Sequence, residues 1–335
     1  MGPPDVPMQA DAMPPAVATG TWRRAKPGLY TLVIVIVLLA AFAYRLRVNG
    51  IFACAAPGSA ADSYLADCNV RGYGDFDHGS FWYGLDAPSR AAAIDADVLF
   101  LGSSRMQYAF SGSPTAQWAA AISVRPFLLG FSHTENVRFF EPLLRQMKPR
   151  AKAYVINVDR FFDDRLTNVT ADLLRDAGTE DRYRGKLRWQ PVHRRLCSAA
   201  PRLCGDNYAI YRARATGMWT SLGRDPGFVA SGTGDGPPED AERWPEFAKI
   251  AQDFVAALPV DRECVVLTHV PSQKSKIAEA RAIAAALGRP LVTPAVDGLR
   301  TFDTSHLDVP SAERWAKAFF AAAGAELARC VHGPR

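Results

Sequence analysis

The chain is poor in the residue patterns that bind metal ions. It has six histidines and six cysteines in 335 residues, without a C-x-x-C motif and without a closely spaced pair of histidines. Structural zinc sites are usually built from such pairs, so we expect no metal site. A nucleic-acid recognition motif is absent as well, and no internal repeat is visible, so we expect neither a nucleic-acid partner nor a repeat architecture.

Size and composition are those of an ordinary globular protein. The chain is 48% hydrophobic and 22% charged, and its net charge of +5 is mild. This length is sufficient for one large domain or two small ones. The charge is unevenly distributed, however, and this becomes important in the middle of the chain.

The first part of the N-terminal region has no apolar periodicity, and the part that follows carries no charge. Residues 1–27 are rich in Pro, Ala and Gly, which predicts a disordered tail. The run "LYTLVIVIVLLAAFAY" at residues 29–44 carries no charge and has basic residues on both sides. We therefore predict a transmembrane anchor over residues 28–46, with the tail cytoplasmic and the remainder on the periplasmic side of an inner membrane.

Two other interpretations of this run stay open. The "AFA" at residues 41–43 resembles a signal-peptidase site, so the segment would then be removed. A buried core helix is the other alternative, although the basic flanks and the polar tail disfavour it. With either an anchor or a signal, the rest of the chain is exported.

The six cysteines fit an exported protein. An even number of cysteines suggests disulfides in an oxidising compartment. Proximity in sequence favours Cys54–Cys68 and Cys197–Cys204, which leaves Cys264–Cys330. Six cysteines nevertheless allow 15 pairings.

The pattern from residue 97 onward predicts an α/β domain over residues 97–330. Short apolar runs alternate with amphipathic segments, which indicates a parallel sheet with helices on both faces. In such sheets the ligand site forms at the carboxyl ends of the strands. Residues 47–96 read as an irregular connector, and residues 166–235 as an insertion. The expected strands are "DVLFLGSS", "RPFLLGFS", "KAYVINVD", "ECVVLTHVP" and "RPLVTP".

Two motifs carry candidate chemistry. "VLFLGSSRM" ends a strand with small residues, which places a serine hydroxyl and backbone N–H groups at the edge of the sheet. A serine nucleophile needs a histidine base that a carboxylate orients. "FDTSHLDVPS" supplies Asp303 three residues before His306. Taken separately, each motif also occurs as a strand-to-helix turn or as a helix cap beside a surface histidine.

Together, "FLGSSR" and "DTSHL" resemble the first and last blocks of the SGNH (GDSL-type) hydrolases, over roughly residues 97–327. The resemblance implies a three-layer, flavodoxin-like α/β fold without a cofactor. It implies Ser104 as the nucleophile, His306 as the base and Asp303 as its partner.

The resemblance also implies an oxyanion hole. Its expected donors are the backbone at Ser104, the glycine of "LLGFSH", which is Gly130, and Asn157 in "INVD". The middle blocks depart from the family pattern. His133 stands where a glycine is expected, and Val158 stands in the place of the family's asparagine.

The anchor, "GSSR" and the final D-x-x-H-L together resemble a narrower group. These are envelope proteins for polysaccharide O-acetylation or D-alanyl transfer, which work beside a membrane-bound O-acyltransferase. The resemblance implies a membrane-anchored periplasmic serine acyltransferase or esterase that acts on acyl esters of envelope polysaccharide. A simple carboxylester or lipid esterase is the alternative, as is a non-catalytic glycan-binding scaffold.

The insertion has a strong excess of positive charge. Residues 182–224 contain nine Arg and one Lys but a single acidic residue, Asp206, with Trp and Tyr interleaved. Such a segment fits an anionic polysaccharide or anionic lipid headgroups. It is equally consistent with a solvated basic subdomain closed by Cys197–Cys204.

Overall fold

A computed structural model describes residue 2 and residues 27–333, apart from gaps at 59–61, 69, 71–72, 133–134, 176–177 and 224–228. All but two residues of the predicted tail lie outside this part of the chain. The chain divides into two units, Met1–Val48 and Asn49–Arg335. We call the second unit the body.

In the described part of the N-terminal unit, the apolar run forms the helix α1 (Pro27–Val48). Its segment Pro27–Leu46 is long and apolar enough to cross a membrane, and none of it is buried inside the protein. Large apolar side chains such as Leu38 and Leu39 are more than half exposed. A helix that is apolar on all sides needs an apolar environment, so an anchor or a signal segment fits and a core helix does not.

The body is built on a five-stranded parallel sheet, which confirms the α/β class and the parallel arrangement. Its strands lie in the order β3-β2-β4-β8-β9. In chain order this is 2-1-3-4-5, a doubly wound arrangement whose order reverses between β2 and β4. The strand bounds are β2 (Val98–Ser103), β3 (Pro126–Phe131), β4 (Ala153–Asn157), β8 (Val265–Thr268) and β9 (Leu291–Val292).

Side-chain alternation along the strands produces two cores. In β2, Leu99 and Leu101 belong to one hydrophobic cluster, whereas Val98 and Phe100 belong to the other. The first cluster includes residues of α6 (Val137–Met147), α9 (Trp244–Ala257) and α10 (Ile277–Ala286). The second includes residues of α4 (Ser104–Phe110), α5 (Ser113–Ala121) and α11 (Val309–His332). Because successive side chains of a strand point to opposite faces, the sheet is covered on both sides.

The connector is not irregular, contrary to our expectation. Strand β1 (Ser63–Cys68) in the connector pairs antiparallel with β5 (Ala209–Ala213), which pairs in turn with β6 (Trp219–Leu222). Helices α2 (Phe76–Trp82) and α3 (Ala87–Ile94) follow β1. The expected connector and insertion thus contribute to one antiparallel sheet, in which β5 and β6 are neighbours in the sequence but β1 finds its partner β5 far away.

The basic segment is correspondingly split between interior and surface. Arg212 in β5 is fully buried, and its guanidinium forms a bidentate ion pair with the buried Asp77 of α2. Arg212 also donates to the carbonyl oxygens of Leu128 and Gly130 in β3, so the antiparallel sheet is attached to the edge of the parallel sheet. The remaining arginines lie mainly on a long helix, α8 (Thr179–Ala199).

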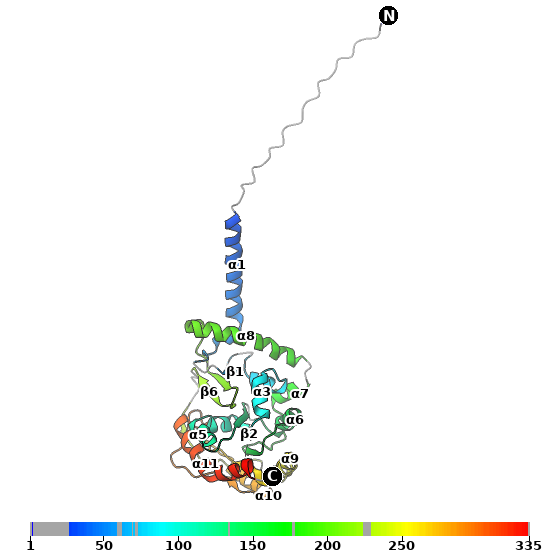
Figure 1. The fold of residues 1–335 in the computed structure, drawn as a ribbon, viewed down its shortest axis with the longest axis vertical. Coiled ribbons are helices and arrows are strands. Elements are labelled where there is room, and N and C mark those ends of the chain that lie inside the picture. The colour runs from blue at the N-terminus through cyan, green and yellow to red at the C-terminus, as the bar shows by residue number, and fades with distance from the viewer. Residues whose placement is uncertain are drawn as a thin grey trace. The chain divides into compact units, whose positions relative to one another are not determined.

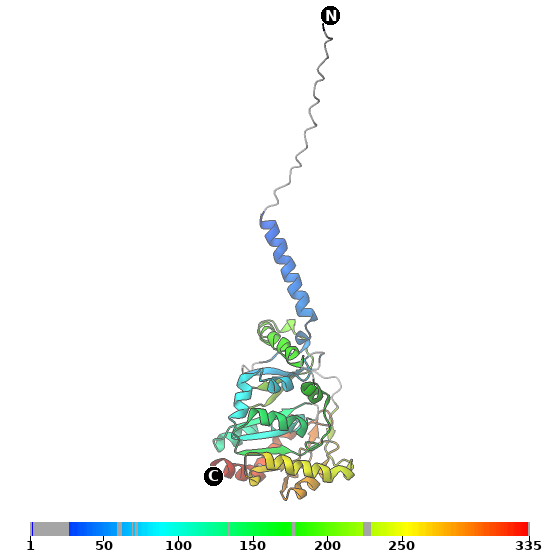
Figure 2. The ribbon, with the colours of Figure 1, turned by 90° about the vertical axis from the view of Figure 1, so that its right-hand side faces the viewer.

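Helix α8 crosses one end of the body, and α9 lies towards the other end (Figures 1 and 2). The remaining elements are short: η1 (Gly50–Ala53), α7 (Asn168–Arg175), η2 (Pro201–Leu203), β7 (Ser231–Gly232), η3 (Ala241–Arg243), η4 (Arg262–Cys264) and β10 (Arg300–Thr301). Strands β7 and β10 pair with each other, which ties the end of the insertion to the chain before Asp303.

All three expected disulfides are present: Cys54–Cys68, Cys197–Cys204 and Cys264–Cys330. The first two close short loops beside β1 and at the end of α8. The third closes a 66-residue separation and ties η4 to α11. Disulfides of this kind indicate an oxidising compartment.

Candidate active site

Ser104 lies at the carboxyl end of β2, beside the position where the strand order reverses. The strand ends at Ser103, and α4 begins at Ser104. Ser103 is 2% exposed, and its hydroxyl accepts a hydrogen bond from the backbone N–H of Arg105 at 3.4 Å. Ser103 therefore caps the helix, while the partly exposed Ser104 is the first helical residue.

The loop that holds Asp303 and His306 folds around the Asp303 carboxylate. Its Oδ1 accepts hydrogen bonds from the backbone N–H groups of Ser305 at 3.1 Å and His306 at 2.8 Å. Thr304 has φ 69°, in the left-handed region that this tight turn requires. The cap of α11 is instead Asp308, whose Oδ1 accepts from the N–H of Ser311 at 2.9 Å.

These two segments, 202 residues apart, meet at the side chains of Ser104 and His306. The distance from His306 Nε2 to Ser104 Oγ is 2.7 Å. On the other side of the ring, Nδ1 lies 2.6 Å from Asp303 Oδ2. The three residues thus form a continuous hydrogen-bonded chain from hydroxyl through imidazole to carboxylate, the arrangement of a serine-hydrolase triad.

Asp303 is held in its charged form. Its partial burial raises its pKa, but the hydrogen bonds and charge of His306 and the N–H of Ser305 outweigh this and leave the pKa below its ordinary value. A carboxylate that stays ionised orients the imidazole and stabilises positive charge on it.

A second contact between the same segments involves Arg105, which sequence reasoning missed. Its Nε donates to Ser305 Oγ at 3.0 Å, and its Nη1 lies 2.5 Å from Asp159 Oδ2. Asp159 follows β4 and is 4% exposed. Arg105 therefore joins the serine helix, the histidine loop and the end of β4. A charged residue at the end of an apolar strand, as in "INVD", was the available signal for Asp159.

Two aromatic rings contact the imidazole of His306. The centroid of the Tyr108 ring is 4.7 Å from that of His306, and the Phe302 ring stacks at 5.6 Å with 21° between planes. Tyr108 lies one helical turn after Ser104. Its hydroxyl hydrogen-bonds Tyr208 Oη and, at 3.0 Å, Ser221 Oγ of β6. The antiparallel sheet thus contributes to one wall of the site.

The structure gives Gly130 a packing role. It lies within β3, opposite Gly102 of β2, and a side-chain Cβ there would be 2.7 Å from Gln107 Cγ. Its carbonyl oxygen accepts hydrogen bonds from Gln107 Nε2 at 3.0 Å and from Arg212. The glycine lets α4 approach the sheet, which explains this residue without an oxyanion. Its role as an oxyanion donor stays a prediction.

The other expected donors are the Asn157 amide and the Ser104 backbone. Asn157 ends β4, is fully buried, and accepts from the N–H of Val270 at 3.0 Å. Its Nδ2 has no hydrogen-bond partner among the described residues. The N–H of Ser104 lies in the first turn of α4, where amides have no partner inside the helix. His133, the other residue at issue, lies outside the described part of the chain.

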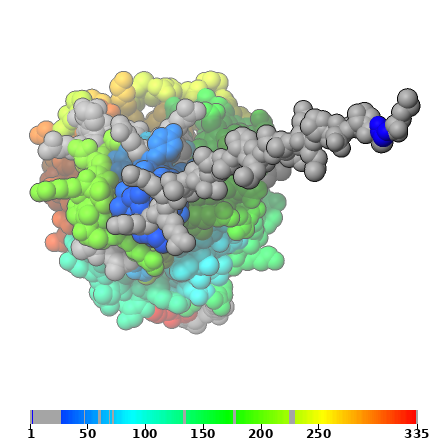
Figure 3. Space-filling model, turned by 90° about the horizontal axis from the view of Figure 1, so that it is seen from above, coloured from blue at the N-terminus to red at the C-terminus, as the bar shows by residue number. Residues whose placement is uncertain are grey.

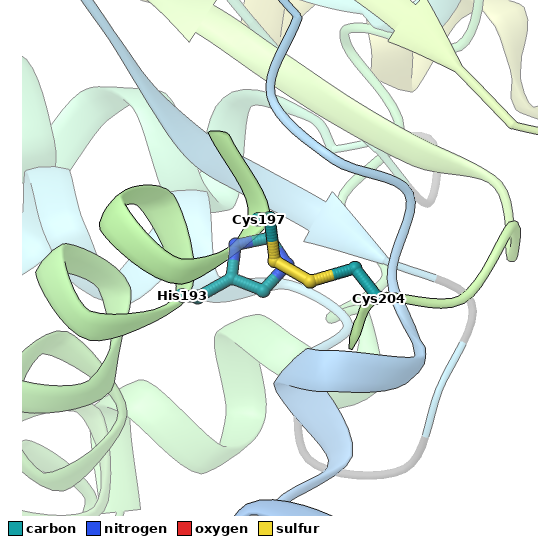
Figure 4. A group of neighbouring side chains, drawn as sticks. All are labelled: His193, Cys197 and Cys204. Carbon is teal, nitrogen blue, oxygen red and sulfur yellow. A yellow bond between two sulfur atoms is a disulfide. The ribbon is translucent and has the colours of Figure 1, made fainter. Parts of the chain in front are cut away.

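Among the residues that the structure describes, one group of potential metal ligands lies outside this site. His193, Cys197 and Cys204 place ligand atoms within 4.8 Å of one another (Figure 4). The two sulfurs are joined in a disulfide. A cysteine binds a metal ion as a thiolate, and neither Cys197 nor Cys204 is a thiolate while the disulfide is intact. This group therefore does not fit a metal ion.

The triad supports acyl-group chemistry at a serine. Ser104 has a base within proton-transfer distance, and that base has an ionised partner. No family model, curated protein or solved structure matches this chain.

Proposed function

We propose that this protein is a membrane-anchored serine acyltransferase or esterase of the SGNH type, acting on acyl esters of envelope polysaccharide. The observation that carries the proposal is the hydrogen-bonded chain Ser104–His306–Asp303, with distances of 2.7 and 2.6 Å. The strand order 2-1-3-4-5 is that of flavodoxin-like sheets and is consistent with this superfamily.

In the proposed reaction, Ser104 Oγ attacks the acyl carbonyl carbon while His306 Nε2 takes the hydroxyl proton. The resulting oxyanion is stabilised by the Ser104 N–H at the start of α4, with Gly130 or Asn157 as the further donor. His306 then protonates the departing alkoxide, which leaves an acyl-serine. A second hydroxyl, from water or a sugar, gives its proton to His306 and attacks the acyl-serine. The bond from the acyl carbon to Ser104 Oγ then breaks, and His306 returns the proton to that oxygen, which restores Ser104 and releases the acid or the new ester. Asp303 orients His306 throughout.

The proposed location is the periplasmic side of the inner membrane, with α1 as a single-pass anchor and a cytoplasmic N-terminus. The apolar α1 and the three disulfides support this placement. The proposed partner is a membrane-bound O-acyltransferase that supplies acyl groups from across the membrane.

A fluorophosphonate probe tests the serine chemistry directly, because it labels an activated serine covalently. We expect mass spectrometry of the purified full chain to find the adduct on Ser104. Ser104→Ala should abolish labelling and the hydrolysis of p-nitrophenyl acetate. Ser103→Ala is the matched control: it removes a helix cap, at a cost of about 1 kcal/mol, and should leave labelling in place. An adduct on Ser103, or full turnover in Ser104→Ala, would refute the assignment.

A further inference from the structure

Helix α8 has one buried face and one basic face. Its buried residues are Thr179, Tyr183, Gln190, His193 and Cys197. On the other side, Arg184, Arg188 and Arg195 are all exposed. At 100° per residue these three arginines lie within about 40° of one another around the helix axis. We call these three residues the basic stripe.

The charge of the stripe is mostly uncompensated. Arg184 pairs with Glu180 at 2.5 Å, one turn earlier. In the described part of the chain, no carboxylate lies within ion-pair distance of Arg188 or Arg195. The helix has no acidic residue after Asp181. The stripe therefore presents a net positive surface along most of α8.

A recess lies beside the stripe. It has a volume of about 290 Å³, and its lining includes Arg194, Arg195 and Arg214. Arg214 already pairs with Asp86 at 3.0 Å. Partial burial, followed by the positive charge of Arg214, lowers the pKa of Arg194. Arg214 also lies 3.6 Å from Asp62, so carboxylates of the body already compensate its charge, and Arg195 is the side chain through which the stripe borders the recess.

The start of the body is attached to the same helix. The ring of Phe52 in η1 contacts those of Trp189 and His193 of α8, with centroids 6.4 and 5.6 Å apart. The backbone N–H of Gly205, just after α8 and η2, donates to the carbonyl of Phe52 at 2.8 Å. The Asn207 side chain donates to Ala53 at 2.9 Å. Figure 3 views the end of the body that α8 crosses.

We propose that the basic stripe binds the anionic phospholipid headgroups of the bilayer that α1 crosses. The inference rests on the anchor of the proposed function. The apolar segment of α1 ends at Leu46 and η1 begins at Gly50, so at most about 14 Å of chain joins the bilayer to the element that packs on α8. Arginines near a membrane surface attract anionic lipids at short range, and salt weakens this attraction. A glycan is the weaker candidate, because the short chain connection to α1 brings the body close to lipid and gives no reason to expect a glycan there.

Arginine footprinting of the full chain in nanodiscs tests the proposal. The chain is incorporated into discs of phosphatidylcholine alone, or with phosphatidylglycerol added, and treated with phenylglyoxal. We expect Arg188 and Arg195 to react roughly fivefold more slowly in the anionic discs, as one favourable contact per arginine implies. Arg262 and Arg329, towards the other end of the body in η4 and α11, should react equally in both. High salt should remove the protection.

Matched charge reversals complete the test. In Arg188→Glu/Arg195→Glu, the remaining Arg184 should lose its protection in anionic discs. In Arg262→Glu/Arg329→Glu, which has the same change in charge, the stripe should stay protected. A chain that fails to enter either disc overturns the anchor and, with it, this proposal. A chain that enters but reacts equally in both discs overturns only the lipid surface. Protection by a soluble anionic oligosaccharide in neutral discs, without protection by lipid, assigns the stripe to glycan instead.

Discussion

At the scale of single residues, Glu279 is an acid whose surroundings oppose its charge. The residue lies in α10 and is 4% exposed, and its Oε1 has no hydrogen-bond partner among the described residues. Burial, and then the negative charge of Asp159, raise its pKa from 4.5 to about 7. The folded protein therefore holds a proton on Glu279 that the unfolded chain releases above pH 4.5.

The sign of the effect on stability follows from this. A group whose pKa rises on folding contributes stability below its unfolded pKa, and the contribution is lost as the pH rises through 7. We predict that the wild-type unfolding free energy falls between pH 5 and pH 8 by up to about 3 kcal/mol on account of this residue. Glu279→Gln should remove that fall and so be more stable than wild type at pH 8, as measured by urea unfolding.

Glu326→Gln serves as the control for this measurement. Glu326 accepts a hydrogen bond from Arg289 at 2.6 Å and is not fully buried. Its substitution removes a carboxylate that has a cationic partner, and so it measures the cost of a Glu-to-Gln change under the same conditions. An unchanged pH dependence in Glu279→Gln would show that its proton is not retained in the folded state.

At the scale of secondary-structure elements, α4 connects the triad to the antiparallel sheet. Tyr108 packs its ring against His306 and places its hydroxyl near Tyr208 and Ser221. Burial and nearby groups raise the pKa of Tyr108 well above its ordinary value, so the hydroxyl stays a neutral donor. The ring restricts the orientation of His306, and the hydroxyl connects α4 with β6.

We predict that Tyr108→Phe, which keeps the ring, retains most of the turnover, while Tyr108→Leu lowers kcat about tenfold or more. KM should change less than kcat, since the ring positions the base and the proposal gives it no contact with the substrate. Steady-state hydrolysis of p-nitrophenyl acetate measures both. A full kcat in Tyr108→Leu would show that the ring has no part in positioning His306.

Local patterns predict the parallel sheet well and the antiparallel sheet poorly. The strands β2, β3, β4 and β8 are buried on both faces, so each reads as a continuous apolar run. Strand β5 has the sequence "AIYRA", in which a buried arginine interrupts the apolar pattern expected of a buried strand. Its burial depends on Asp77, 135 residues earlier, and local periodicity carries no information about such a partner.

The residues of the candidate site also fall into those that local sequence patterns predict and those that they do not. Ser104, Asp303 and His306 come from motifs whose local chemistry is visible, a strand end and a D-x-x-H turn. Ser103 beside Ser104, and Asp308 two residues after His306, have the same side-chain types as members of the triad, and the observed capping bonds separate them from it. Arg105 and Tyr108 act through contacts with distant segments, which spacing along the chain does not reveal.

At the scale of the whole molecule, the Arg212–Asp77 ion pair attaches the antiparallel sheet to the parallel one. Both side chains are buried, and the Arg212 guanidinium also faces the rings of Phe81, Phe131 and Trp219. It donates to carbonyl groups of the edge strand β3, which leads towards the site. Removal of one partner leaves the other as a buried charge without a counter-charge, and this destabilises the folded state strongly.

We therefore predict that Arg212→Met lowers the unfolding free energy of the full chain in detergent by about 3–5 kcal/mol, as measured by urea unfolding with disulfides intact. The double variant Arg212→Met/Asp77→Asn should recover part of this loss, because no unpaired charge remains. Arg214→Met is the matched control two residues later. Its partner Asp86 is buried, but Arg214 itself is partly exposed, so its loss should be smaller. If Arg212→Met and Arg214→Met cost the same, burial of the Arg212–Asp77 pair is not what holds the two sheets together.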